Sequence, residues 1–161
     1  MIDKDLLKGK RILAVDDEED ILDTLAEQFE PYEITTAKSY EEALGLISEG
    51  SFDLALLDIM GVNGFQLLEK CREKGIPAAM LTAHSITVDS VNKALQLGAV
   101  SFLPKQELAN IKEHVIEIFD GLNEGRSHWK RLFDRLGNFF NQRLGLTWEK
   151  IDKPRNPPYM Y

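Results

Sequence analysis

The chain has 161 residues, 43% of them apolar and 29% charged, which suits one ordinary domain with a buried core plus an appendage. Its single cysteine, Cys71, excludes an intrachain disulfide, and no apolar stretch has the length that crosses a bilayer. The net charge of −8 disfavours nucleic-acid binding, which needs a cationic surface, and the charged residues 1–10 are unlike a signal peptide, so we expect a cytoplasmic protein.

Short apolar runs alternate with amphipathic stretches along most of the chain, at the spacing of βα units. The apolar runs predict five strands, at residues 11–15, 33–37, 54–57, 78–82 and 101–103. Apolar residues at helical spacing predict helices at residues 20–29, 40–48, 65–74, 87–97 and 107–119. This alternation predicts the α/β class, with a five-stranded parallel, doubly wound sheet that is covered by helices on both faces.

Residues suited to phosphoryl chemistry stand at the ends of four of these runs. Asp16 and Asp17 follow the first strand, Asp58 follows the third, Thr82 closes the fourth and Lys105 follows the fifth. In an open parallel sheet, ligands bind outside the carboxyl ends of the strands, so we expect these side chains to meet. Clustered carboxylates need a cation, and magnesium prefers oxygen ligands of this kind.

The competing interpretation is that the acids are solvated charges in loops and at helix N-termini. Glu18, Glu19 and Asp20 fit this interpretation, because acidic residues stabilise the positive end of the helix that they open. For the set of Asp16, Asp17 and Asp58 it is the weaker explanation, since four strand ends would have to carry suitable residues by chance.

Four segments resemble the receiver domains of two-component response regulators. The strings ILAVDDEEDI, LALLDIM, MLTAHS and GAVSFLPK match the family's first, third, fourth and fifth strands in order, and the resemblance covers about residues 10–119. It implies a flavodoxin-like receiver domain over residues 1–121. It also implies a phosphoprotein of a phosphorelay, whose Asp58 accepts a phosphoryl group from the phosphohistidine of a histidine kinase or phosphotransfer protein. Such a domain is not an enzyme, although it assists its own phosphorylation and dephosphorylation.

The resemblance also assigns the remaining site residues. Magnesium would be held by Asp16, Asp17, Asp58 and the backbone carbonyl of Met60. Thr82 would donate a hydrogen bond to one phosphoryl oxygen, and Lys105 would pair with another. Thr82 and Phe102 would form the switch: Thr82 moves toward the phosphoryl group, and Phe102 rotates inward and alters the surface of the fourth helix, fifth strand and fifth helix. The alternative for Phe102 is a plain core aromatic.

The chain departs from the family pattern at two places near the site. The glycine that opens the third helix, Gly64, comes six positions after Asp58 instead of the usual eight, so the loop is shorter by two residues. Gly61, Asn63 and Gly64 would permit the tighter path. At the second place a proline precedes Lys105, whereas the family commonly places one after it. Phosphotransfer rate or kinase docking is expected to differ from that of a typical member.

Residues 122–161 interrupt the βα pattern and form a separate extension. Residues 121–161 carry 8 Lys and Arg against 4 Asp and Glu, whereas residues 1–120 carry 11 against 23. An aromatic stripe at helical spacing predicts an amphipathic helix, with Trp129, Leu132, Phe133, Leu136, Phe139, Phe140 and Leu144 on one face. This span is too short for a winged-helix output domain. We favour packing on its own domain or a homodimer through the last helices and this extension, over contact with a membrane or nucleic acid.

Two other function classes compete with the response regulator. The first is a phosphorylation-silent, receiver-like dimerisation or interaction module, for which the shortened loop after Asp58 is the best argument. The second is an aspartyl-nucleophile phosphatase, which typically has a second aspartate two residues after the nucleophile. That position holds Met60, so the enzyme is the less favoured of the two.

Overall fold

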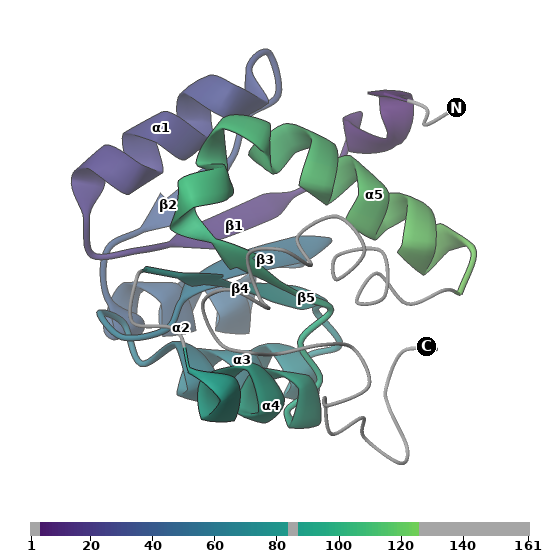
Figure 1. The fold of residues 1–161 in the computed structure, drawn as a ribbon. Helices are drawn as coiled ribbons and strands as arrows, with labels where there is room; N and C mark the ends of the chain where they lie inside the picture. Colours follow the sequence, from purple (N-terminus) through teal and green to yellow (C-terminus); the bar gives the residue numbers. More distant parts are fainter. Residues whose placement is uncertain (1–3, 84–86, 126–161) are drawn as a thin grey trace.

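The computed structural model describes residues 4–83 and 87–125, which form one parallel sheet with helices on both faces. The five strands pair in the order β2-β1-β3-β4-β5 (Figure 1). Their bounds are β1 Ile12–Val15, β2 Thr35–Ala37, β3 Leu54–Asp58, β4 Ala78–Thr82 and β5 Ser101–Pro104. The predicted five-stranded, parallel, doubly wound fold is confirmed. The predicted amphipathic helix and extended tail lie outside the described residues.

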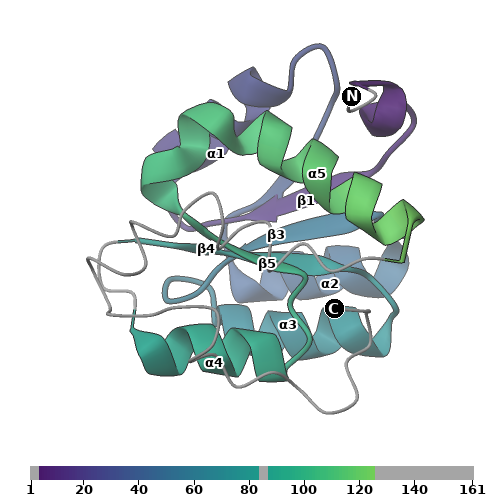
Figure 2. The same ribbon diagram turned by 45° about the vertical axis from the view of Figure 1, so that its right-hand side comes forward.

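Two helical layers enclose the sheet. Figures 1 and 2 show α1 and α5 on one face and α2, α3 and α4 on the other. The bounds are α1 Glu19–Phe29, α2 Tyr40–Glu49, α3 Gly64–Glu73, α4 Val88–Gln96 and α5 Ile111–Asn123, with short 3₁₀ helices η1 Lys4–Leu7 and η2 Lys105–Asn110. Every residue of β1, β3, β4 and β5 is buried, as strands covered on two faces require. Within the described part of the chain, no helix combines the length and apolarity needed to cross a membrane.

The fifth helical segment differs from its prediction. In place of one helix at residues 107–119, the chain forms η2 from Lys105 to Asn110 and then α5, which continues to Asn123. The break falls at Asn110, whose backbone (φ −110°, ψ 15°) is not α-helical. Apolar residues three positions apart lie on one face of either an α-helix or a 3₁₀ helix. Their spacing over six residues therefore does not distinguish the two helix types.

Side-chain caps fix where two of the helices begin. The Ser39 hydroxyl accepts a hydrogen bond of 3.2 Å from the Glu42 N–H at the start of α2. At the start of α4, the Thr87 hydroxyl accepts from the Ser90 N–H and the Ser90 hydroxyl accepts from the Thr87 N–H, which is a reciprocal capping box. This box fixes the N-terminus of α4 just after the segment that follows β4.

Candidate phosphoryl and magnesium site

The register of the parallel strands places the predicted site residues at one edge of the sheet. Val15 pairs with Leu57, so Asp16 and Asp58, each one residue farther along, emerge beside each other. Thr82 pairs with Pro104 at the ends of β4 and β5, and Lys105 follows directly. Four segments that are distant in sequence therefore deliver an acid, a second acid, a hydroxyl and an ammonium to neighbouring positions.

The Lys105 ammonium connects the carboxylates of this edge. Its Nζ lies 2.8 Å from Asp16 Oδ2, 3.0 Å from Asp58 Oδ1 and 3.3 Å from Glu18 Oε2. The Lys105 side chain is only 13% exposed and that of Asp16 is fully buried. A buried charge of this kind is tolerated only beside a partner, so Lys105 and the two aspartates depend on one another.

Burial and ion pairing act in opposite directions on the pKa values of this cluster. Burial raises the pKa of Asp16, and this outweighs the lowering by Lys105 and by the Glu18 N–H, which donates to Asp16 Oδ1 at 2.9 Å. For Lys105, burial lowers the pKa, but the close contacts with the Asp16 and Asp58 carboxylates outweigh it and raise the pKa overall. Lys105 therefore carries its positive charge at neutral pH.

Both oxygens of the Asp58 carboxylate have partners. Oδ1 faces Lys105, and Oδ2 accepts a hydrogen bond of 3.0 Å from the backbone N–H of Gly61. These two contacts fix the orientation of the carboxylate at the end of β3. The Asp58 side chain is 8% exposed, so it is largely shielded from solvent.

The acidic cluster fits a magnesium ion. Asp16, Asp17 and Asp58 each offer a carboxylate oxygen, and these oxygens all lie within 4.8 Å of one another. Asp16 Oδ2 is buried and receives no hydrogen bond of good geometry, although the Lys105 charge is close to it. Three carboxylates with one ammonium leave an excess of negative charge, and all the donors are oxygens, as magnesium prefers. Met60, the fourth predicted contributor, is 81% exposed, and the role of its backbone carbonyl stays a prediction.

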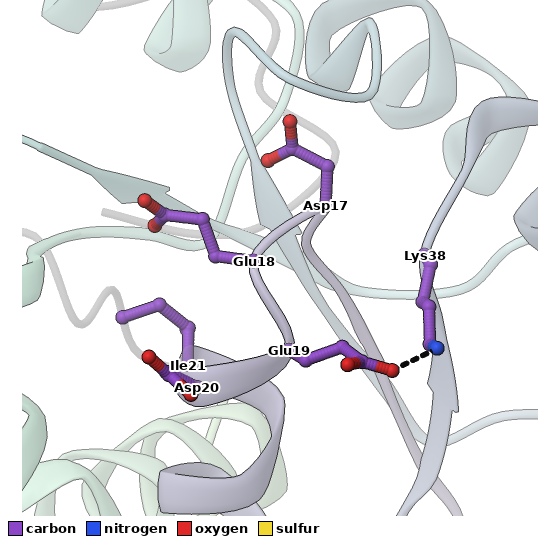
Figure 3. Close-up of a pocket in the computed structure, with 6 residues that line it drawn as sticks. All are labelled: Asp17, Glu18, Glu19, Asp20, Ile21 and Lys38. Carbon is purple, nitrogen blue, oxygen red and sulfur yellow. Dashed lines mark hydrogen bonds and ion pairs between the residues drawn. The ribbon is translucent and has the colours of Figure 1, made fainter.

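The acidic residues that follow β1 differ in where their side chains point (Figure 3). Glu19 turns toward Lys38 and forms an ion pair with it, whereas Asp17 points away from this pair. Glu19 and Asp20 are exposed in the first turn of α1, as the interpretation of helix-terminal charges predicted. Glu18 shares that exposure, yet its carboxylate also contacts Lys105.

Thr82 and Asp58 line one cavity of about 330 Å³ together with Ile59, Met60, Phe65, Ala83, Thr87 and Ser90. The Thr82 hydroxyl donates a long hydrogen bond of 3.4 Å to the Ala83 carbonyl. Phe102 is fully buried in β5, opposite Met80 of β4. This position agrees with a core aromatic and with the inward position of a switch, so its role as a switch stays a prediction.

Two participants were not foreseen as members of the site. One is Glu18, whose contact with Lys105 depends on a side-chain conformation that no sequence pattern specifies. The other is the backbone of Gly61, which contacts Asp58. The short loop was a signal that this glycine is needed for a tight path, but it did not indicate the contact.

Comparison with known proteins agrees with this geometry. The family described as the response regulator receiver domain matches residues 12–116. The two-component response regulator ARR18 of Arabidopsis thaliana is 39% identical over 119 residues, which cover 68% of this chain and 19% of that protein. The response regulator SaeR of Staphylococcus aureus (strain USA300) is 38% identical over 100 residues, covering 58% and 43%. The chain thus matches less than half the length of these relatives.

A solved structure supports the same assignment of the fold. The CheY-like response regulator receiver domain protein from Methanospirillum hungatei JF-1 superposes with a TM-score of 0.59 and 30% sequence identity. The match covers 69% of this chain and 96% of that one.

Proposed function

This chain belongs to the family of response regulator receiver domains, and on that premise we propose that it accepts a phosphoryl group on Asp58 from a histidine kinase or phosphotransfer protein. The observation that carries the proposal is the position of Lys105. Its Nζ lies 3.0 Å from Asp58 and 2.8 Å from Asp16, although the three residues come from different strand ends. A hydrophobic core does not require a cluster of charged side chains, whereas phosphoryl transfer requires aligned oxygens and nearby positive charge.

The proposed reaction is a transfer between two side chains. A carboxylate oxygen of Asp58 attacks the phosphorus of a phosphohistidine, the new O–P bond forms, and the P–N bond breaks with its electron pair returning to the imidazole. Asp58 then carries an acyl phosphate, with Lys105 beside one phosphoryl oxygen and the Thr82 hydroxyl beside another. Asp16, Asp17, Asp58 and the Met60 carbonyl would hold magnesium, which supplies positive charge to the phosphoryl oxygens when bound.

The signal would pass from the site to a surface formed by neighbouring elements. We propose that residues 1–121 are the receiver domain and that Thr82 and Phe102 couple the site to the surface of α4, β5 and α5. Residues 122–161 would extend this surface and pair with a second copy or with the chain's own domain. On this proposal the output within these 161 residues is a protein contact in the cytoplasm and not a conventional DNA-binding domain.

Chemical phosphorylation tests the acceptor. Acetyl phosphate with magnesium should label the wild-type protein, and Asp58→Asn should lose the label while its circular dichroism spectrum is unchanged. The matched control is Asp23→Asn, which changes an exposed aspartate of α1 and should be labelled normally. Undiminished labelling of Asp58→Asn would remove Asp58 as the acceptor.

A phosphorylation-silent interaction module is the second candidate function. It is favoured by the short loop, because the Gly61 N–H and Lys105 already occupy both oxygens of Asp58. Beryllofluoride, which mimics a phosphoryl group, separates the two candidates. A receiver that switches should change its molecular mass or partner binding in solution when beryllofluoride and magnesium are added, whereas a silent module should not.

A further inference from the structure

The loop between β3 and α3 touches the acidic cluster at Gly61. A Cβ atom built on Gly61 would lie 2.3 Å from Asp17 Oδ1, 2.4 Å from Asp17 Cγ and 2.6 Å from Asp17 Oδ2. These distances are far below any van der Waals contact, so the Gly61 backbone lies directly against the Asp17 carboxylate. Gly61 does not have a positive φ, unlike Gly9 and Gly75. Glycine is therefore needed at this position because a side chain would not fit, and not because the backbone has a positive φ.

The same residue also contacts a second carboxylate of the cluster. The Gly61 N–H donates a hydrogen bond of 3.0 Å to Asp58 Oδ2. Asp17 follows β1 and Asp58 ends β3, so a single residue of the loop contacts acids from two neighbouring strands. Its position thereby relates the two carboxylates to each other.

We propose that Gly61 is a positioning residue of the magnesium site, and this rests on the proposed function, in which the acidic cluster binds magnesium. The missing side chain lets the shortened loop close against Asp17 and sets the distance between the Asp17 and Asp58 carboxylates. Any side chain at position 61 displaces the Asp17 carboxylate. Because Asp17 is exposed, its side chain can rotate away, so the fold survives while the ligand set loses a member.

Gly64, three residues later, has a different role. A Cβ atom on Gly64 would lie 2.1 Å from the backbone oxygen of Asp58 and 2.9 Å from Ile59 Cα. These are backbone atoms of the strand end and cannot rotate away. The two glycines of the short loop are therefore needed for different reasons: Gly64 for the fold and Gly61 for the position of a ligand.

Titration calorimetry with magnesium chloride tests the proposal on the full chain. Gly61→Ala should lower magnesium affinity by about 10-fold or more, as expected when a residue that orients a metal ligand is changed. Its urea unfolding midpoint without magnesium should stay close to that of the wild type. The matched control is Gly45→Ala in α2, where an added Cβ meets nothing within 4 Å. This control should bind magnesium like the wild type.

A double substitution identifies the route of the effect. In an Asp17→Ala background, Gly61→Ala should cause no further loss of magnesium affinity, and Asp17→Ala should restore any stability that Gly61→Ala loses. An equal loss in both backgrounds, or unchanged affinity in the single Gly61→Ala variant, would overturn the positioning role and leave the proposed function intact. A wild-type protein that does not bind magnesium would overturn both.

Discussion

Lys38 and Lys105 both pair with acids that follow β1, yet the surroundings of the two lysines differ. The side chains of Lys38 and Glu19 are 57% and 66% exposed, whereas Lys105 is 13% exposed and its partner Asp16 is fully buried. Water screens the first pair, and pairs of that kind contribute little to stability. The second pair is largely shielded from water, so the charge of each residue must be stabilised by its partner. The extent of burial, and not the residue types, therefore distinguishes the surface ion pair from the ion pair at the site.

The largest expected effect is that of Lys105→Met. This change leaves Asp16 and Asp58 facing each other without a counter-charge, and we expect the free energy of unfolding at neutral pH without magnesium to fall by about 3 kcal/mol. Labelling by acetyl phosphate should fall strongly as well. Urea unfolding followed by circular dichroism measures the first effect. A variant as stable as the wild type would mean that the two aspartates do not depend on Lys105.

Alkaline pH should reveal the same dependence. The folded-state pKa of Lys105 is raised above its ordinary value of 10.5, so its contribution to stability is complete below pH 10.5 and declines as the pH rises beyond it. We expect stability to fall with pH above 10.5 in the wild type and less steeply in Lys105→Met. Lys38→Met should keep most of the wild-type slope. Identical slopes in the wild type and Lys105→Met would contradict the raised pKa.

Cys71 shows what burial does without a counter-charge. It is fully buried in α3, and this burial raises the pKa of its thiol to about 12. Because the thiolate is the reactive form, we expect iodoacetamide at pH 8 to leave the folded protein unmodified and to alkylate it fully in urea. Mass spectrometry gives an unambiguous result, since the chain has one cysteine. Rapid alkylation of the folded protein would show that this part of α3 opens readily.

The smallest effect is expected for Lys38→Met. The exposed pair with Glu19 should contribute no measurable stability, so urea unfolding should match that of the wild type. Labelling of Asp58 should also be unchanged, since Lys38 pairs with Glu19 and the Asp17 side chain points away from that pair (Figure 3). If Lys38→Met were as damaging as Lys105→Met, burial would not be what distinguishes the two lysines.

The strands could be predicted closely, and with them the meeting of the site residues. The fourth strand begins at Ala78 and ends at Thr82, as predicted, because strands buried on both faces appear as continuous apolar runs. Once the sheet is parallel, its carboxyl ends share one edge, so the approach of Asp16, Asp58 and Lys105 follows from topology. Their roles in phosphoryl transfer stay predictions.

The contacts that depend on loop conformation could not be predicted. The break at Asn110 between η2 and α5 leaves the apolar periodicity almost unchanged, so no pattern located it. The approach of Glu18 to Lys105 requires one particular side-chain conformation, and that of Gly61 to Asp17 requires the path of a five-residue connection between β3 and α3. The sequence predicts a short loop, and the structure shows which residues it contacts.

Locating the acceptor by chemical trapping tests the central claim most directly. Wild-type protein would be treated with acetyl phosphate and magnesium and then with borohydride, which reduces the acyl phosphate of an aspartate to homoserine, and the site would be read by tandem mass spectrometry. The account predicts homoserine at position 58 and none at positions 16 or 17. Homoserine at another carboxylate, or at none, would contradict it.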